Sequence, residues 1–335
     1  MRLINRIFRC LAVGVVLSAH AYTVAAQVVP QVMAWVPAYG MATSMEAIES
    51  NSKLGEGLTR LGLQLWNPSP DGRSVVLAPT NKRGELVRSS DVVRFRNWAK
   101  ARNIKVLLTV YNNSQVMEKW DWGLAKRAFT ENHADFSAAL IREMNKYELD
   151  GIDLDLEGEG DLEKDRAAYS LFVEALSTQL KLQGKLLTID SFHSPCDNAP
   201  NMSWWIDWLG KVDSIHSMGY QDLYEGNNET FTPLGRPVCE GGAPIFKYSW
   251  QLQYAMNFGY KPEQILMGMP TWLDRWGAGG MGSDLVSHLQ ELQVLGMGVA
   301  LWDLQLAENK WRSPETWNAI RALRLKARVN QKPLR

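Results

Sequence analysis

The sequence predicts an α/β protein built as a single eight-stranded (β/α)8 TIM barrel. From residue 31 to the end of the chain, eight short apolar runs of strand length alternate with longer runs of helical period. One of the apolar runs carries acids at alternate positions, as a barrel strand does when its inner face ends in a site. An open doubly wound sheet is the alternative, but no glycine-rich phosphate turn follows the first strand.

Length and composition agree with one globular domain. The chain has 335 residues, of which 46% are hydrophobic and 21% are charged, so it can bury a core of ordinary size. The formal net charge is zero, which gives no indication of nucleic-acid binding.

The expected strands are apolar runs that end at proline, glycine or polar residues. The run Ile-Lys-Val-Leu-Leu at residues 104–108 is typical of a buried strand. A loop through Gly72 and Pro79 follows the second run. We expect strands at residues 32–36, 61–66, 105–111, 150–157, 186–191, 213–220, 265–271 and 299–304.

Helix starts and stops are indicated between these strands. Residues 43–46, Thr-Ser-Met-Glu, resemble a capping box, and Asp91 is expected to cap the next helix. Ser313 and Pro314 suit the N-cap and first position of the last helix. We expect further helices at residues 134–147, 163–183, 202–209, 249–258 and 284–295, with Gly184, Gly259 and Gly296 as stops.

The first 26 residues have the pattern of a secretory signal peptide. Arg2, Arg6 and Arg9 precede a short apolar run at residues 10–17, and Val-Ala-Ala at 24–26 offers a cleavage site. We therefore expect residues 27–335 to form the mature catalytic barrel, with a net charge of −3, secreted or periplasmic and without a membrane span. An uncleaved anchor is the alternative.

Two cysteines remain after removal of the signal segment. Cys196 and Cys239 both fall in loop-like segments, and an even pair in an exported protein favours one disulfide. Two separate free thiols are the alternative.

The stretch 150–157, Asp-Gly-Ile-Asp-Leu-Asp-Leu-Glu, puts Asp153, Asp155 and Glu157 on one face of a strand. Same-face Cβ atoms two residues apart are separated by roughly 6–7 Å, so at least one of these acids should hold a proton near neutral pH. A calcium loop is a rival reading, but it needs a glutamate at its twelfth position, where Lys164 stands.

The expected strand ends are rich in acids and aromatic rings. This combination suits a carbohydrate, because sugar C–H faces pack on rings while carboxylates bind hydroxyls. The residues at these ends are Trp35, Tyr39, Asp190, His193, Met218, Tyr220, Asp222, Trp272, Asp274, Trp302 and Asp303. His193 near Cys196 is too small a ligand set to indicate a metal, and the helical spacing of Trp204, Trp205 and Trp208 indicates packing.

Residues 150–157 resemble the signature of glycoside hydrolase family 18, the chitinases and endo-β-N-acetylglucosaminidases. The pattern is D-G-hydrophobic-D-x-D-x-E, and every specified position matches. Two weaker likenesses agree with it: Met218-Gly219-Tyr220 resembles the family's Met-x-Tyr of strand six, and Trp302 resembles the tryptophan of strand eight. The resemblance extends over residues 31–325.

The resemblance implies substrate-assisted catalysis that needs no metal or other cofactor. Glu157 would be the general acid, while the substrate's own 2-acetamido carbonyl would be the nucleophile. Asp155 would orient the acetamido N–H and share a proton with Asp153. Tyr220 would bind the acetamido oxygen, and Trp302 would form the floor of the site. Substrate contacts are further expected from Met218, Trp35, Tyr39, Tyr111, Asp222 and Trp272.

Three features depart from the family pattern. Gln221 follows Tyr220 where an acid is usual, and Asp222 comes one residue later. The third strand reads Thr-Val-Tyr-Asn at residues 109–112 instead of Ser-x-Gly-Gly, so Tyr111 would narrow the site or change what it accepts. About 25 residues separate strands seven and eight, which leaves no room for a large α+β insertion and implies a shallow cleft.

We therefore expect a monomeric, retaining hydrolase of β-1,4-linked N-acetylglucosamine polymers. An endo-β-N-acetylglucosaminidase acting on N-glycans or peptidoglycan is a second hypothesis. An inactive chitin-binding lectin on the same fold is a third, although family lectins typically lack the acid that corresponds to Glu157.

Overall fold

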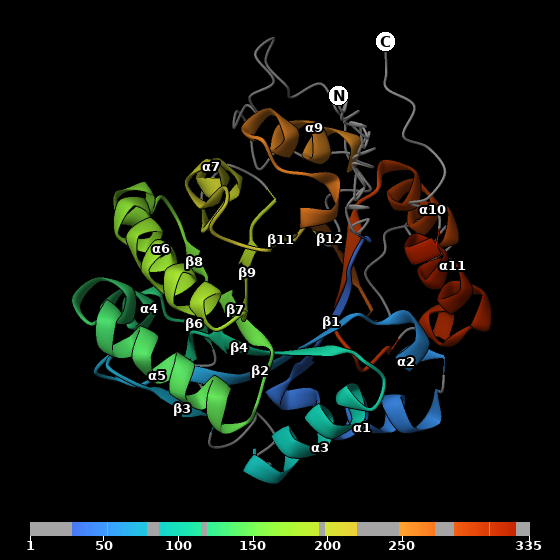
Figure 1. The fold of residues 1–335 in the computed structure, drawn as a ribbon, viewed down its shortest axis with the longest axis horizontal. Coiled ribbons are helices and arrows are strands. Elements are labelled where there is room, and N and C mark those ends of the chain that lie inside the picture. Colours follow the sequence, from blue (N-terminus) through green and yellow to red (C-terminus); the bar gives the residue numbers. More distant parts are fainter. Residues whose placement is uncertain are drawn as a thin grey trace, which may run out of the picture.

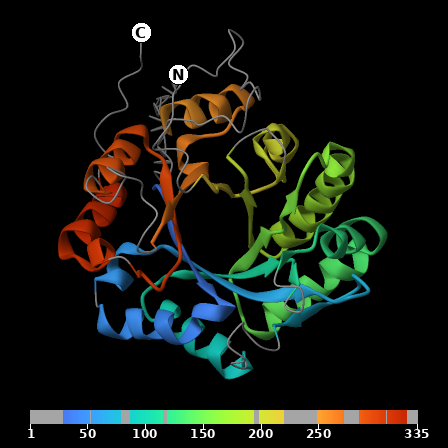
Figure 2. The same cartoon turned by 180° about the vertical axis from the view of Figure 1, so that it is seen from behind.

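The computed structural model describes residues 29–51, 53–78, 87–114, 119–193, 198–219, 248–271, 285–307 and 309–325. Eight parallel strands form a closed barrel, because the first strand pairs with both the second and the last. Helices surround the strands, with α5 (His133–Lys146) and α6 (Arg166–Leu182) across the ring from α10 (Leu285–Leu295) and α11 (Pro314–Leu325) (Figure 1). The reverse view shows the same ring (Figure 2). The predicted TIM barrel is confirmed.

The barrel strands lie close to the predicted positions. Two coincide with the prediction at both ends, and the sixth is shorter than expected. In chain order the strands are β1 (Val32–Pro37), β2 (Arg60–Pro68), β4 (Lys105–Tyr111), β7 (Gly151–Asp155), β9 (Leu186–Ser191), β11 (Ser214–Ser217), β12 (Ile265–Pro270) and β13 (Gly298–Trp302).

Short elements decorate this ring. Strand β3 (Val75–Leu77) pairs antiparallel with β2, in a segment that was expected to be a loop. Two small antiparallel pairs join β5 (Asn113–Ser114) to β6 (Lys119–Trp120) and β8 (Gly158–Glu159) to β10 (Asn198–Ala199). The remaining described α-helices are α1 (Met41–Ser50), α2 (Leu54–Gly57), α3 (Ser89–Lys100), α4 (Trp122–Lys126), α7 (Trp205–Trp208) and α9 (Tyr248–Phe258).

Two helix starts differ from the prediction. Helix α1 begins at Met41, directly after a 3₁₀ turn, with Gly40 as its N-cap and no side-chain capping bond. Residues 43–46 therefore lie inside the helix and form no capping box. In α3, Asp91 is in the first turn, where its carboxylate accepts the backbone N–H of Arg88 at 2.9 Å, instead of being the N-cap.

The predicted helix ends are confirmed elsewhere. The hydroxyl of Ser313 accepts the N–H of Thr316 at 3.2 Å, as an N-cap should. Gly184, Gly259 and Gly296 have φ values of +63°, +105° and +73°, which a glycine adopts without strain.

Successive residues of β1 point to opposite sides of the barrel wall. Val32, Ala34 and Val36 belong to the large core between strands and helices, whereas Met33 and Trp35 point into the barrel. The inner cluster comprises Met33, Trp35, Leu107, Leu266 and Ala300, with Leu186 and Trp302 packed against it. One cluster lies between the strands and the helices and the other lies inside the barrel, as expected of a barrel whose interior is filled by side chains.

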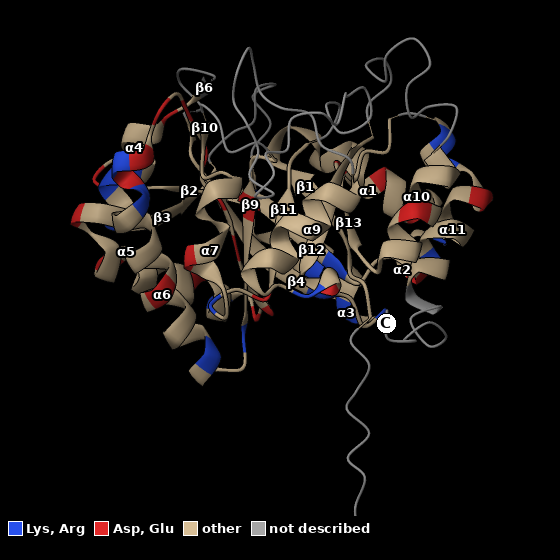
Figure 3. Ribbon diagram, turned by 90° about the horizontal axis from the view of Figure 1, so that it is seen from above, with Lys and Arg blue, Asp and Glu red and all other residues tan. Residues whose placement is uncertain are grey.

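Charged residues of both signs lie on the outer helices of the described barrel (Figure 3). Among the described residues, no helix combines the length and hydropathy needed to cross a bilayer. Lys and Arg residues are interspersed with Asp and Glu over the outer helices (Figure 3). This mixture agrees with the formal net charge of zero.

Candidate active site

Strand β7 places the acid row on the inner face of the barrel. Ile152 and Leu154 point outward into the large core, so Asp153 and Asp155, which alternate with them, point inward. Glu157 lies two residues beyond the end of β7 and is half-buried. The three acids follow one another as predicted, but only two of them belong to the strand.

Asp153 is fully buried and surrounded by hydrogen-bond donors. Its Oδ2 accepts from Trp35 Nε1 and from Thr109 Oγ1, each at 2.9 Å, and its Oδ1 accepts from the Thr188 hydroxyl. Burial raises the pKa of Asp153, but its interaction with His216 and the hydrogen bonds from Thr188 and Trp35 outweigh burial and lower that pKa. Asp153 is therefore a buried carboxylate that keeps its charge.

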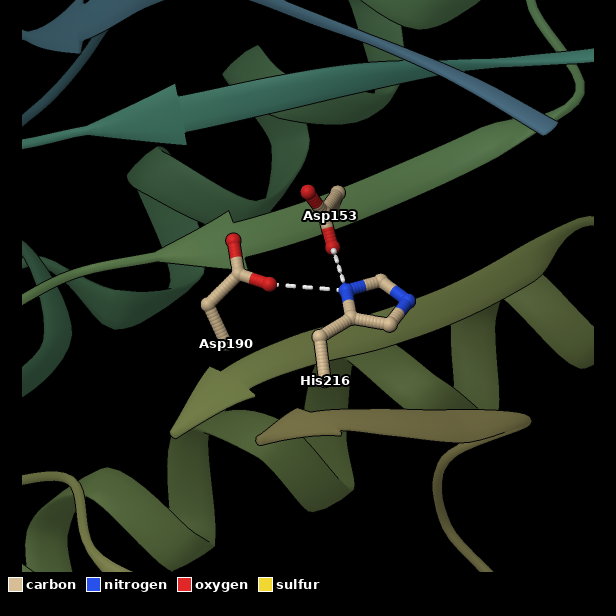
Figure 4. A group of neighbouring side chains, drawn as sticks. All are labelled: Asp153, Asp190 and His216. Carbon is tan, nitrogen blue, oxygen red and sulfur yellow. Dashed lines mark hydrogen bonds and ion pairs between the residues drawn. The ribbon is translucent and has the colours of Figure 1, made fainter. Parts of the chain in front are cut away.

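Asp190 on β9 and His216 on β11 lie beside Asp153 (Figure 4). His216 Nδ1 lies 2.7 Å from Asp190 Oδ1 and 3.4 Å from Asp153 Oδ1. Burial, together with the charges of Asp153 and Asp155, raises the pKa of Asp190 well above its usual range. Burial also lowers the pKa of His216, so His216 disfavours a positive charge. Asp190 is the acid of this group that holds a proton.

The same three side chains are the described candidates for a metal site. Ligand atoms of Asp153, Asp190 and His216 all lie within 4.8 Å of one another. The 2.7 Å contact between Asp190 and His216 is a hydrogen-bond distance, so a shared proton accounts for this geometry.

Arg60 supplies a buried positive charge on the same inner surface. Its Nη1 donates to Ser214 Oγ at 2.6 Å, and that oxygen lies 3.4 Å from His216 Nε2. Burial lowers the pKa of Arg60, and the charges of Asp213 and Asp153 oppose that effect. The guanidinium thus balances acids that would otherwise be uncompensated in the barrel.

Asp155 and Glu157 are neighbouring carboxyl groups, and the ionisation of one is linked to that of the other. Burial raises the pKa of Asp155 to about 7, although the hydrogen bonds from Glu157 and from Gln64 Nε2, at 2.6 Å, oppose it. Burial and the Asp155 charge raise the pKa of Glu157 well above its usual range. The pair therefore retains a proton at neutral pH, as a general acid requires.

One oxygen of Asp155 is left without a donor. Gln64 donates to Oδ2, whereas no N–H or hydroxyl group of a described residue reaches the buried Oδ1. A buried carboxylate oxygen in this state is available to an N–H group of a bound molecule.

The backbone of Glu157 is held by Asn112. Asn112 Nδ2 donates to the carbonyl oxygen of Glu157, and the N–H of Glu157 donates to Asn112 Oδ1, both at 2.7 Å. These bonds fix the residue that carries the acid, although it lies outside the strand.

Aromatic rings cover the acids from the side of the first and last strands. The rings of Trp35 and Trp302 have centroids 5.6 Å apart, and Trp302 is partly exposed. Trp35 is 1% exposed, so it supports Trp302 and binds Asp153 instead of facing a sugar. The Tyr39 hydroxyl donates to Asp303 Oδ2 at 3.1 Å. The burial of Tyr39 and the Asp303 charge raise the pKa of Tyr39, which keeps its hydroxyl protonated.

Tyr111 follows the inner face of β4 beside the acid row. It pairs in register with Asp155, and its ring meets the edge of Trp120 at a centroid distance of 6.3 Å. With 5% exposure, Tyr111 fills space next to the acids.

The model of the family described as "Glycosyl hydrolases family 18" matches residues 64–317, well over half of the chain. The chain belongs to glycoside hydrolase family 18. It is a chitinase-like glycoside hydrolase, as its acid row indicated. No curated protein sequence matches the chain significantly.

Solved structures of family 18 enzymes share this fold at low sequence identity. A chitinase from Bacteroides thetaiotaomicron has a TM-score of 0.64 at 17% identity, covering 91% of this chain and 99% of its own. A chitinase from Chromobacterium violaceum has a TM-score of 0.62 at 15% identity, with coverages of 88% and 98%. The Bacillus cereus spore cortex-lytic enzyme SleL has a TM-score of 0.61 at 15% identity, with coverages of 87% and 73%.

Several predicted site residues of this family 18 hydrolase lie outside the described residues. They are Tyr220, Asp222, Trp272 and both cysteines of the predicted disulfide, Cys196 and Cys239. Met218 is described: it follows β11, is half-buried, and its N–H donates to the carbonyl of Ser191 at 2.8 Å.

The packing role predicted for the tryptophan cluster is confirmed, and Asp150 is structural as well. Asp150 lies outside the site, where its carboxylate accepts the N–H of Val106 at 2.9 Å and pairs with Lys105. The three clustered tryptophans, Trp204, Trp205 and Trp208, are fully buried packing residues.

The sequence reasoning missed five polar residues that contact the acids: Gln64, Thr109, Asn112, Thr188 and His216. Gln64 interrupts an apolar strand, Leu-Gln-Leu, at an inward position, which is a signal that could have been used. His216 stands two residues before Met218 and so shares its face of the strand, which is a comparable signal.

Proposed function

We propose that this enzyme cleaves β-1,4-linked N-acetylglucosamine polymers, chitin or chitooligosaccharides, with retention of the anomeric configuration. The Asp155–Glu157 pair carries the proposal, because its shared proton supplies a general acid and its second carboxylate has an oxygen free for a substrate N–H. Family membership supports the same chemistry, since family 18 enzymes use the substrate's acetamido group in place of a second carboxylate nucleophile.

In the first step, Glu157 donates its proton to the glycosidic oxygen while the acetamido carbonyl oxygen attacks C1. The bond between C1 and the leaving oxygen breaks, and the substrate becomes a cyclic oxazolinium. Asp155 accepts a hydrogen bond from the acetamido N–H and balances the positive charge of the ring. In the second step, Glu157 takes a proton from water, the water oxygen attacks C1, and the acetamido group reforms.

The remaining site residues position the sugar. Trp302 provides a ring for the sugar face, backed by Trp35, and Tyr220 binds the acetamido oxygen. Tyr39, Tyr111, Met218, Asp222 and Trp272 complete the binding surface. Asp153 stays charged, and its charge raises the pKa of Asp155.

The decisive experiment compares wild type with Glu157→Gln on chitooligosaccharides, a glycoprotein and peptidoglycan. Glu174→Gln, an exposed substitution of the same kind on α6, is the matched control. We expect wild type and control to cleave chitooligosaccharides and Glu157→Gln to lose at least about 10²-fold in kcat.

Each outcome identifies one function. Turnover confined to the glycoprotein or to peptidoglycan would establish the endo-β-N-acetylglucosaminidase alternative. Binding of chitooligosaccharides without turnover of any substrate would establish the lectin and overturn the enzyme proposal.

We also propose that the mature enzyme is an exported monomer with a Cys196–Cys239 disulfide, because its first 26 residues have the signal-peptide pattern. N-terminal sequencing of exported protein should begin at Gln27. Two reactive thiols in the denatured, unreduced protein would exclude the disulfide.

A further inference from the structure

Just beyond the end of β7, the side chain of Asn112 makes the two backbone hydrogen bonds that a neighbouring strand would otherwise make. Strands β4 and β7 pair in parallel register until Tyr111 meets Asp155, which is the last residue pair of the ladder. Glu157 lies past this point, yet both of its backbone polar groups are bonded to one carboxamide at 2.7 Å. Asn112 is fully buried, so water does not compete for these bonds.

A carboxamide suits this position because it carries a donor and an acceptor in one plane, as a peptide group does. A carboxylate would offer acceptors alone, and an aliphatic side chain would offer neither. Glycine or alanine here would leave the N–H and C=O of Glu157 without these partners.

Asn112 is itself anchored to the start of α4. Its carbonyl accepts the N–H of Asp121 at 2.9 Å, and the Asp121 carboxylate accepts the N–H of Leu124 at 3.0 Å as the N-cap of α4. The position of Glu157 is thus tied to β4 and to the start of α4, and not to β7 alone.

We propose that Asn112 is a positioning residue that holds Glu157 so that its carboxyl stays against Asp155. The kinetic consequence of the proposal rests on the function proposed above. The two hydrogen bonds between the Asn112 side chain and the Glu157 backbone, called the clamp below, are a property of the free protein. Proton transfer to a glycosidic oxygen demands close placement of the acid, and a misplacement of about 1 Å costs about 10²-fold in rate.

The kinetic test compares Asn112→Ala with Asn132→Ala. Asn132 also donates to two backbone carbonyls, those of Asp71 and Arg127, but it lies away from the acids. Both variants lose two hydrogen bonds, so both should lose stability. Only Asn112→Ala should lose about 10²-fold in kcat while its KM changes less than about threefold.

A second variant guards against misfolding. Asn112→Asp keeps the volume and the acceptor for the Glu157 N–H, but as a carboxylate it has no donor for the Glu157 carbonyl. Its kcat should lie between those of wild type and Asn112→Ala. Values of kcat equal to that of Asn132→Ala for both Asn112 variants would overturn the proposal.

A titration tests the clamp without any substrate. The Glu157 carboxyl is followed by carbon-13 labelling of glutamate, and its signal is assigned by its loss in Glu157→Gln. Freed from Asn112, the carboxyl should move toward water, and its pKa should fall by about one unit or more from the raised value. An unchanged Glu157 pKa in Asn112→Ala would contradict the clamp, even if wild type cleaved none of the substrates and the proposed function failed.

Discussion

Replacing Gln64 with leucine tests whether the proton shared by Asp155 and Glu157 is carried mainly by Glu157. Gln64 is 3% exposed, and its Nε2 donates to Asp155 Oδ2 at 2.6 Å, inside a barrel where water does not replace it. This bond stabilises ionised Asp155 and thereby favours the state in which Glu157 carries the proton. Leucine has a similar volume but no donor.

The magnitude follows from the hydrogen bond. A bond to a charged group is worth about 1.5–3 kcal/mol, and one pKa unit corresponds to about 1.4 kcal/mol. The pKa of Asp155, about 7 in the wild-type protein, should therefore rise by roughly one to two units in Gln64→Leu. The kcat should fall at the same time, because less of the enzyme has its proton on Glu157.

The assay is the pH dependence of kcat on a chitooligosaccharide. The fall of kcat at high pH reports loss of the last proton from the Asp155–Glu157 pair. This fall should occur at higher pH in Gln64→Leu. Gln179→Leu, an exposed substitution on α6, should leave the profile in place. A fall that stays at the same pH or moves to lower pH would refute this reasoning.

Three further perturbations have expected outcomes. Trp35→Phe removes the 2.9 Å donor to buried Asp153 and should destabilise the protein by about 1–3 kcal/mol in urea unfolding. The pKa of His216 is lower in the folded protein than its unfolded value of about 6.5. Below that pH the unfolded chain binds a proton that the folded protein does not, so the free energy of unfolding falls. His216→Gln should therefore lose less stability than wild type when unfolding is measured from pH 7 down to pH 5, and an equal loss would contradict this assignment. Gly62→Ala would put a Cβ 2.5 Å from Trp35 Cδ1 and 2.6 Å from Met33 Cε, and thermal unfolding should report a loss of about 1–3 kcal/mol.

The fold could be predicted because its determinants are local. Alternation along β1 and β7 follows from residue order alone, and β4 and β9 have the predicted bounds. The capping box expected at residues 43–46 failed because the chain turns straight from β1 into α1, which begins two residues earlier. A tertiary connection overrode a local signal there.

The candidate site could be predicted only in part, because its contacts join distant positions. The period of two indicated that Asp153 and Asp155 face inward, but it carries no information about which donors meet them. Gln64 and Asp155 are 91 residues apart, and Asn112 and Glu157 are 45 apart. The proton sharing expected between Asp153 and Asp155 stays a prediction, and residue order could not show that Trp35, Thr109 and Thr188 all donate to Asp153.

The closure of the ring has a consequence for how this enzyme acquires its site. The first strand reaches Asp153 through Trp35, across 118 residues, and Tyr39 reaches Asp303 across 264. Contacts of such sequence separation form late, after loop-closure entropy has been overcome. In a fragment that lacks either end of the described barrel, the candidate site therefore lacks some of these contacts. A nascent chain cannot complete the candidate site before its last strand has been made.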